Sequence, residues 1–476
     1  MTGTSSLHAL PPDVVLQILV YLDVLSLVAL SCVDTRLKAL SQEHSFWFRP
    51  LAGAHRIRPL ACPAADDLSL RTAAELRRLA LHSLRLERNW STSFPSVAKP
   101  VKTLALTNHD EMMLNIPGTN LIVLEDWEEA TLVCMDVETG EQSDAVRIGA
   151  IYDMSSPVED KASCAMSALS VMSGNQMLSV LRVAMPGQSK PVIEDSLRLI
   201  LDPSYQYSAT FLTESVVGVV RQTEGRSLEI QTFNLVDPTI STVVVTDCPA
   251  VEIMGSVVFD RTIYLVVLVG TNAFVYACPE KLLAIGSPSA DIDYTIRRSH
   301  VARVALSFPT DITRVCFPRS VLSSEPRSGR SFISVTDVHA RRGATTDRSL
   351  EVTFWRRPWS ESDDESAQHR LVLPVKTVVV EGKLTEHPAS HAEPLIIANS
   401  GLTVLLLVEV PEADSPKMLL IRYDPAEKTA STHELRFDAS ESGLDLKAVR
   451  GITLDDHIGV VMAVTEDKRL HVIPYA

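Results

Sequence analysis

The change in hydrophobic period near residue 90 is the feature that most constrains this chain. Up to about Trp90, apolar residues recur at helical spacing, for example at Val14, Val15, Ile18, Leu19 and Leu22. After about Val101, apolar runs are short, rich in Val, Ile, Leu and Thr, and bounded by Gly, Asn, Asp or Pro. This order predicts a multidomain α + β protein in which a helical unit precedes an all-β domain.

The strand-like runs fall into groups of about four that recur roughly every 50 residues, which is in the range of propeller blades. The groups begin near residues 101, 150, 207, 251, 311, 371 and 447. The last group has room for about three strands before Ala476. We therefore expect a propeller of six to seven blades, with Val101 to Leu106 supplying the missing strand and closing the ring. A large β-sandwich or two smaller β domains is the alternative.

Composition and charge narrow the functional classes. The chain has 476 residues, 46% hydrophobic and 22% charged, which is normal for a folded protein. Its formal net charge is −15, from 44 Lys+Arg and 59 Asp+Glu, and this balance argues against bulk binding to nucleic acid or anionic membranes. Residues 1–90 carry +2 and the remainder −17, so the charge divides where the period changes.

Cysteine usage and the first apolar stretch bear on localisation. Seven cysteines without paired spacing do not form a disulfide framework and favour a reducing compartment. The apolar stretch from Val14 to Val33 has no basic residue before it, the first being Arg36, and Asp23 interrupts it. We expect neither a signal peptide nor a membrane span, and a cytoplasmic and/or nuclear location.

The helical unit carries an ordered motif of many positions. It opens with Leu10-Pro11, continues through Asp13 and a series of apolar residues, and ends near Phe46-Trp47. This pattern, from Leu7 to Leu51, resembles the F-box, and we place an F-box of three helices at residues 5–52. Here Asp13 stands where the family has Glu, and Arg36 and Leu37 stand in its basic-basic-aromatic stretch.

The apolar content of these helices indicates an interface independently of the motif. A unit of about 45 residues has a small core, and its helices are apolar on more than one face, so some apolar surface is left for contact. The alternative is that this surface packs against the rest of the chain. The resemblance implies docking on the adaptor Skp1 and, through it, on the cullin of a Skp1–cullin–F-box ubiquitin ligase. The expected adaptor-facing or supporting residues are Leu10, Pro11, Val14, Ile18, Leu19, Leu22, Leu27, Leu30 and Val33.

A linker and a β domain follow. We expect a helical linker at 53–90, with a helix from Arg71 to Arg88 that joins the two halves, and a propeller-like substrate-recognition domain at 91–476. The stretch from Leu132 to Glu141 resembles the strand-turn end of a WD-type blade, with Met135-Asp136 at the place of the dipeptide. The whole layout resembles fungal-type F-box proteins with a degenerate WD-like propeller.

One segment of the β domain is basic. Residues 297–357 contain 12 Arg, no Lys and 5 Asp+Glu. Arginine pairs bidentately with carboxylate and phosphate, so Arg341, Arg342, Arg356 and Arg357 are candidate contacts to an acidic or phosphorylated protein substrate. Alternatively, these arginines neutralise the chain's own acidic residues, such as 361–365.

Signatures of catalysis are missing from the sequence. It contains no phosphate-binding loop, dinucleotide fingerprint, H-E-x-x-H, G-x-S-x-G or C-x-x-C. Pro388 argues against a metal site at His387 and His391. We expect a non-catalytic adaptor with no metal or cofactor. A scaffold whose F-box and Skp1 act outside a ligase is the competing hypothesis, and a propeller-type hydrolase is disfavoured.

Overall fold

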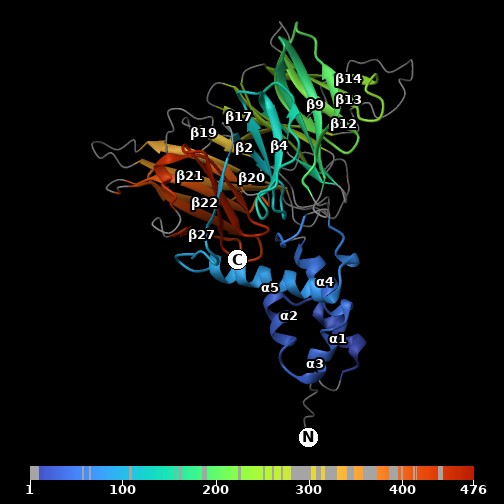
Figure 1. Ribbon diagram of the computed structural model, residues 1–476, viewed down its shortest axis with the longest axis vertical. Coiled ribbons are helices and arrows are strands. Elements are labelled where there is room, and N and C mark those ends of the chain that lie inside the picture. The colour runs from blue at the N-terminus through green and yellow to red at the C-terminus, as the bar shows by residue number, and fades with distance from the viewer. Residues whose placement is uncertain are drawn as a thin grey trace.

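The computed structural model places helices at one end of the molecule and strands at the other (Figure 1). It describes residues 10–55, 58–63, 66–106, 110–155, 157–159, 163–184, 190–222, 227–249, 252–259, 262–269, 272–279, 302–306, 312–316, 330–339, 348–357, 373–384, 395–397, 400–410, 413, 415–437 and 443–476. The helices, in chain order, are α1 (Pro12–Leu19), α2 (Val24–Leu30), α3 (Thr35–Leu40), α4 (His44–His55) and α5 (Ala73–Trp90).

Short polar side chains set the helix starts. Pro11 precedes α1 in extended geometry, and Asp13 lies in the first turn, where a carboxylate favours the helix dipole. Asp23 caps α2 by accepting the amide hydrogen of Ser26, and Asp34 caps α3 by accepting that of Leu37. Asp23 and Asp34 thus fix where α2 and α3 begin.

The helices share a core around two aromatic side chains. Phe46 and Trp47 of α4 are fully buried in edge-to-face contact, 4.9 Å between ring centroids. The Trp47 indole donates to the carbonyl oxygen of Ser41 at 2.7 Å, so its polar group is satisfied. Leu19, Leu27, Leu51 and Leu76 complete this core.

Helix α5 belongs to both halves of the molecule. Its N-terminal turns bury Leu76, Leu79 and Ala80 in the core of the first helices. Its C-terminal turns bury Leu86 and Trp90 among strands of the β domain. The expected joining helix is therefore confirmed, although it begins after the Thr72 cap rather than at Arg71.

Within the described residues, the strands form seven antiparallel sheets, here called blades 1 to 7. Blade 1 contains β2 (Asp110–Asn115), β3 (Leu121–Asp126), β4 (Thr131–Asp136) and β5 (Val146–Arg147). Blade 2 contains β6 (Ala150–Met154), β7 (Val158–Glu159), β8 (Ser163–Met172), β9 (Asn175–Ala184) and β10 (Ile193–Ile200). Blade 3 contains β11 (Gln206–Leu212), β12 (Val216–Gln222), β13 (Ser227–Asn234) and β14 (Ser241–Pro249). Blade 4 contains β15 (Glu252–Phe259), β16 (Thr262–Val269), β17 (Asn272–Pro279) and β18 (Ala302–Leu306).

The remaining blades follow the same plan. Blade 5 contains β19 (Ile312–Cys316), β20 (Arg330–His339), β21 (Arg348–Arg357) and β22 (Leu373–Glu381). Blade 6 contains β23 (Lys383–Leu384), β24 (Leu395–Ile397), β25 (Thr403–Glu409), β26 (Lys417–Asp424) and β27 (Thr429–Glu434). Blade 7 contains β28 (Val449–Asp455), β29 (Val460–Thr465), β30 (Arg469–Pro474) and β1 (Lys102–Ala105). Each blade contacts the next, and β28 of blade 7 contacts β2 of blade 1, so the sheets form a closed ring.

The expected ring closure is confirmed. Strand β1 pairs antiparallel with β30, with Lys102 opposite Val472 and Ala105 opposite Arg469. The first strand of the β domain thus completes the sheet formed by the last three. This pairing covers the outer edge of β30 and the facing edge of β1. The propeller has seven blades, the upper of the two expected numbers.

The strand grouping expected near residue 371 is wrong by one strand. Residues 373–381 form β22, which pairs with β21 as the outer strand of blade 5. Blade 6 begins at Lys383 instead. Only Gly382 separates β22 from β23, and its φ of +117 lets the chain turn there. Because no longer loop separates the two blades, the sequence pattern does not show where blade 6 begins.

Candidate functional site

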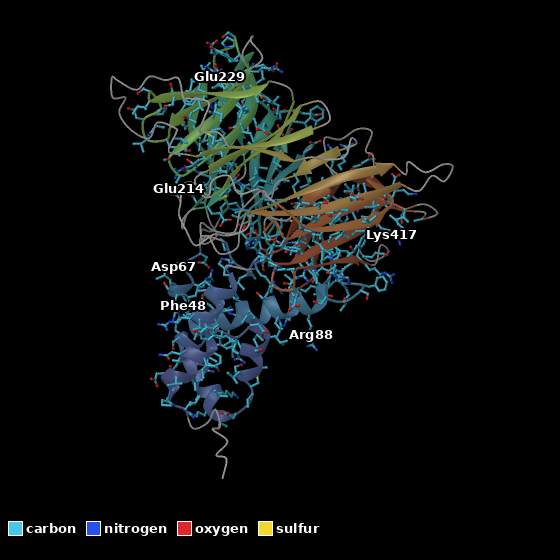
Figure 2. The ribbon with its side chains drawn as sticks, turned by 180° about the vertical axis from the view of Figure 1, so that it is seen from behind. Phe48, Asp67, Arg88, Glu214, Glu229 and Lys417 are labelled. Atoms are coloured by element: carbon cyan, nitrogen blue, oxygen red, sulfur yellow. The ribbon has the colours of Figure 1, made fainter. Side chains whose placement is uncertain are left out.

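Exposed apolar side chains gather on the first two helices and the segment after them. Tyr21 is 88% exposed, Leu25 59% and Val33 64%, and Ile18 and Val20 are also exposed. Large apolar side chains in a small domain normally lie inside, so a cluster of this size indicates contact with another protein. Figure 2 shows these helices projecting away from the β domain, with Phe48 on the same helical unit.

The residues predicted from the motif divide by burial. Pro11, Ile18 and Val33 are exposed, and Leu10, Val14, Leu22 and Leu30 are half-buried. Leu19 and Leu27 are fully buried in the helical core, so they have no surface to offer a partner and can act only by supporting the fold. The adaptor-binding role of the whole set stays a prediction.

Two exposed residues, Tyr21 and Leu25, were not among the predicted contacts. Tyr21 lies just past the end of α1, and Leu25 is the second residue of α2. The first helices carry more apolar residues than one helix face can bury, and Tyr21 and Leu25 are part of this excess. The excess is the sequence signal that could have identified them.

Arg36 fixes the start of this surface. Its guanidinium donates a hydrogen bond to the carbonyl oxygen of Leu10, across 26 residues of sequence. The contact joins the beginning of α3 to the Leu10-Pro11 segment before α1. The basic residue of the motif therefore has a structural role within the helical unit.

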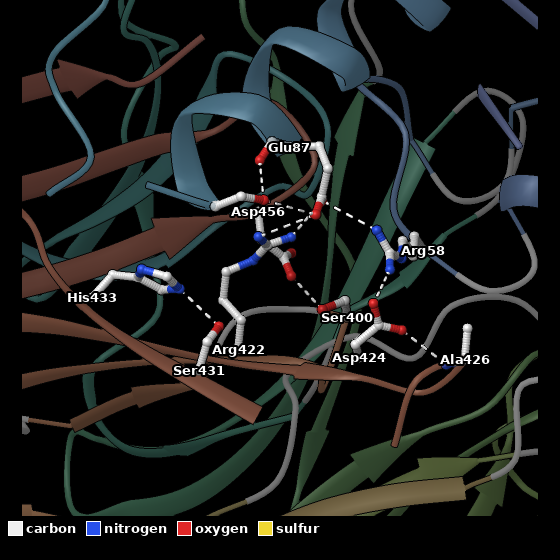
Figure 3. A network of polar contacts seen from close by, with 10 residues as sticks. Arg58, Glu87, Ser400, Arg422, Asp424, Ala426, Ser431, His433 and Asp456 are labelled. Atoms are coloured by element: carbon white, nitrogen blue, oxygen red, sulfur yellow. Dashed lines mark hydrogen bonds and ion pairs between the residues drawn. The ribbon is translucent and has the colours of Figure 1, made fainter. Parts of the chain in front are cut away.

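Four charged side chains tie the helical unit to blade 6 (Figure 3). Glu87 of α5 accepts from Arg422 of β26 at 2.6 Å and pairs with Arg58 at 3.2 Å. Arg58 also pairs with Asp424, two residues beyond Arg422 on the same strand. Asp424, Arg58, Glu87 and Arg422 thus form a row of alternating charge joined by three ion pairs, which we call the Glu87 network.

The charges of the Glu87 network support one another. Burial disfavours the charged form of Glu87, but Arg422 and Arg58 outweigh it, and the pKa of the Glu87 carboxyl is lowered. For Asp424, burial again opposes the shift, while Arg58 and backbone amides of the following turn lower the pKa of its carboxyl. Both acids are therefore ionised at neutral pH.

A second contact joins the segment before α5 to blade 7. The Nδ1 atom of His457 lies 3.1 Å from the carbonyl oxygen of Leu60 and 3.0 Å from that of Cys62, so this nitrogen carries the proton. Asp455 accepts the amide hydrogen of Gly118 at 2.8 Å, which joins blade 7 to blade 1 beneath the same segment. Together with the Glu87 network, these bonds hold the helices against one end of the propeller.

The WD-like turn predicted at Met135-Asp136 has counterparts in other blades. The Asp136 carboxylate accepts the amide hydrogens of Glu138 and Thr139, and Gly140 closes the turn at φ +81. Asn234 and Asp424 accept the amides two and three residues ahead in the same way. All three residues end the third main strand of their blades, so the repeat is an Asp or Asn position and not a conserved dipeptide.

The predicted arginine contacts are only partly described. Arg341 and Arg342 lie outside the described residues. Arg356 and Arg357 end β21, opposite Ser331 and Arg330 of β20. His387 and His391 also lie outside, and among the residues that the structure describes no group of three or more His, Cys, Asp or Glu could hold a metal ion.

Comparison with known proteins agrees with this division of the chain. Residues 7–52 match the family model described as F-box-like. The chain thus carries an F-box-like domain followed by a β-propeller, and such a domain implies an adaptor of the Skp1 type as partner. No curated protein sequence matches the chain.

Among the solved structures similar to the chain are a domain described as a β-propeller and one described as a WD40 domain. The propeller domain of Cps50 (Swd1) from Myceliophthora thermophila is 9% identical, with a TM-score of 0.45, covering 79% of this chain and 99% of its own. The WD40 domain of SCAP from fission yeast is 10% identical, with a TM-score of 0.36, covering 75% and 82%. At such identities the likeness concerns the fold alone, and the seven blades rest on the strand pairing described above.

Proposed function

We propose that this chain is a substrate-recognition subunit of a Skp1–cullin–F-box ubiquitin ligase. The F-box docks on the Skp1-type adaptor, which links it to the cullin, and the propeller binds a protein substrate. The observation that carries the proposal is the F-box-like match at residues 7–52 on a unit whose exposed side includes Tyr21, Leu25 and Val33. Its buried side is already occupied by its own core and by α5.

The proposed mechanism is positioning. A ring of blades offers a broad face of loops that suits recognition of another protein. Holding the substrate on the same rigid body as the ligase raises the local concentration of its lysines near the ubiquitin-charged enzyme. The chain itself performs no covalent step and needs no metal or cofactor.

The predicted arginine contacts remain part of the proposal. Reversing the charge of Arg341 and Arg342 should lower capture of an acidic or phosphorylated substrate. Full capture by the reversed variant would remove these arginines from the proposed site, as would the finding that they only neutralise residues 361–365.

Localisation is proposed as cytoplasmic and/or nuclear, because the seven cysteines favour a reducing compartment. Where the structure describes helices, none is both long and apolar enough to cross a bilayer.

Co-purification from cells separates a ligase subunit from a scaffold that uses the F-box and Skp1 outside a ligase. Tagged full-length chain should retain Skp1 and cullin, and a bound partner should accumulate when the proteasome is inhibited. Recovery of Skp1 without cullin, and without such accumulation, favours the scaffold. Loss of Skp1 from the wild-type chain contradicts both.

A further inference from the structure

An aromatic surface lies where blades 2 and 3 meet, at the end of the propeller away from the F-box. The loop after β28 meets the F-box linker, so the loops joining first and second strands lie near the helices. Strands alternate in direction, and the loops joining second to third strands and one blade to the next therefore lie at the opposite end. Figure 2 agrees, since Glu229, near the start of β13, lies far from the helices that carry Phe48.

The surface is built from Tyr152, Val171 and Tyr205, with Tyr207 beneath them. Tyr152 is 45% exposed and Val171 42% exposed, and Tyr205 is half-buried. The Tyr152 hydroxyl donates to Gln176 at 3.3 Å, and Gln176 pairs with Val171 across the sheet, so these side chains share one face of blade 2. Tyr205 lies 6.5 Å from Tyr207, ring centroid to centroid, on the blade 3 side.

Polar contacts fix the tyrosines before any partner binds. The Arg221 guanidinium lies 3.9 Å from the centre of the Tyr205 ring and is itself held by Glu229 at 2.8 Å and Gln231 at 2.9 Å. The Tyr207 hydroxyl donates to the carbonyl oxygen of Asp202 at 3.2 Å. Burial and the nearby Asp153 raise the pKa of Tyr152 to about 12, so its hydroxyl stays protonated. Aromatic side chains held in this way lose little entropy on binding.

The charge of the surface determines the kind of partner. Glu229 neutralises Arg221, and Asp195 neutralises Arg198, which lies beside Met172 at the same end of blade 2. Asp202 is exposed, and hydrogen bonds from Ser204 lower the pKa of its carboxyl, so it is ionised at neutral pH. Asp153 adds a second carboxylate between the two blades, where its Oδ2 accepts the amide hydrogen of Thr210 at 2.6 Å. The remaining charge is therefore negative, as is that of the whole chain.

We propose that this surface binds a protein segment in which Lys or Arg stands beside apolar side chains. Aromatic rings attract cations through their faces, and Asp202 offers a carboxylate at the rim. The apolar side chains of the segment would pack on Val171 and the tyrosines. If the proposed function holds, the segment belongs to the substrate. The site is separate from the arginine-rich segment 297–357, whose described strands belong to blades 4 and 5.

The test begins with a random library of peptides about 12 residues long, displayed on phage and selected on the purified full-length chain. The proposal expects enrichment of Lys or Arg next to aromatic or aliphatic residues. Enrichment of acidic or phosphate-mimicking sequences, or no enrichment, would overturn it. No adaptor is present, so failure here is distinct from failure of the ligase proposal, which co-purification with Skp1 and cullin tests.

Two substitutions at one site then test the sign of the charge. For the recovered peptides, Val171→Lys should weaken binding at least about tenfold, whereas Val171→Glu should leave it equal or tighter. Tyr152→Ala should also weaken binding, and Val236→Lys, on an exposed loop at the opposite end, should not. Melting temperatures of all variants check the fold. Equal effects of Lys and Glu at position 171, or wild-type binding by Tyr152→Ala, would contradict the proposal.

Discussion

Single residues decide how the F-box linker sits on the propeller. Gly118 lies between β2 and β3 at φ +70, and a Cβ atom added there would come within 2.3 Å of the backbone of Cys62. Its amide also donates to buried Asp455. This glycine is needed for both its backbone conformation and the close approach of the linker.

Gly118→Ala should therefore destabilise the protein well beyond the cost of the backbone conformation alone. We expect a loss of roughly 2–4 kcal/mol in the free energy of unfolding, because the linker segment must move away. Gly174→Ala is the matched control, since Gly174 also has a positive φ but nothing lies within 4 Å of the added atom. It should cost about 1 kcal/mol. Equal losses in urea unfolding would show that contact with Cys62 is unimportant.

The buried carboxyl of Asp455 predicts that the free energy of unfolding depends on pH. Burial, with a smaller contribution from Asp456, raises the pKa of its carboxyl to about 6, although His457 and the amide of Gly118 oppose the shift. The unfolded chain has the ordinary value near 4. Between these values the folded protein binds the proton more tightly, so the free energy of unfolding falls as pH rises from about 4 to about 6.

Asp455→Asn removes this ionisation but keeps an oxygen acceptor. The difference in free energy of unfolding, variant minus wild type, should rise across this pH window by roughly 1–3 kcal/mol and then level off. The measurement is chemical unfolding at several pH values. A difference that stays constant with pH would mean that Asp455 does not titrate as described.

At the scale of elements, the sequence pattern predicted those helices and strands that depend on nearby residues. The joining helix follows from residues close in sequence, and the closing strand follows from the small number of strands that fit before Ala476. In α2, Asp23 rather than Ser26 is the capping residue, and the amide of Ser26 donates to the Asp23 carboxylate. Either residue could cap, and the packing of Leu27 in the core decides between them.

Contacts between distant elements could not be predicted in this way. Arg58 and Asp424 are separated by 366 residues, and nothing in either local sequence indicates the pair. Likewise, the motif does not separate Leu19 and Leu27, which are buried, from Val33, which is exposed, because burial depends on where α4 and α5 pack.

The Glu87 network predicts that the attachment of α5 to the propeller depends on charge. Glu87→Ala leaves Arg58 and Arg422 without their shared carboxylate, and we expect a loss of about 1–2 kcal/mol in the free energy of unfolding. The side chains are partly exposed, so salt should reduce this difference between about 0.05 M and about 0.5 M sodium chloride.

Arg88→Ala is the control, because Arg88 lies exposed on the same helix (Figure 2). It should change stability by less than about 0.5 kcal/mol. A loss from Glu87→Ala that is no larger, or that does not respond to salt, would contradict an electrostatic attachment.

At the scale of the whole molecule, the ring depends on β1. Leu106, just after β1, donates its amide hydrogen to the carbonyl oxygen of Lys468 at 2.8 Å and is buried between blades 1 and 7. Leu106→Pro removes the donor and should cost about 3 kcal/mol or more in the free energy of unfolding. Amide hydrogen exchange in β30 should accelerate with it.

Ala105→Pro is the control, because it places a proline beside Leu106 without removing a hydrogen bond to β30. In an edge strand neighbouring amides point in opposite directions, so the Ala105 amide points away from β30. This variant should be clearly more stable than Leu106→Pro. Similar losses in both variants would mean that closure does not rest on this pairing.

The central claim is that the exposed apolar residues of the F-box bind a Skp1-type adaptor. Titration calorimetry of purified Skp1 into the full-length chain tests it most directly. We expect one-to-one binding by the wild type, weakened at least about 30-fold by the pair Leu25→Asp and Val33→Asp. Val236→Asp on blade 3 should bind as the wild type does. Absence of binding by the wild type, or equal affinity for the Leu25 and Val33 variant, would contradict the account.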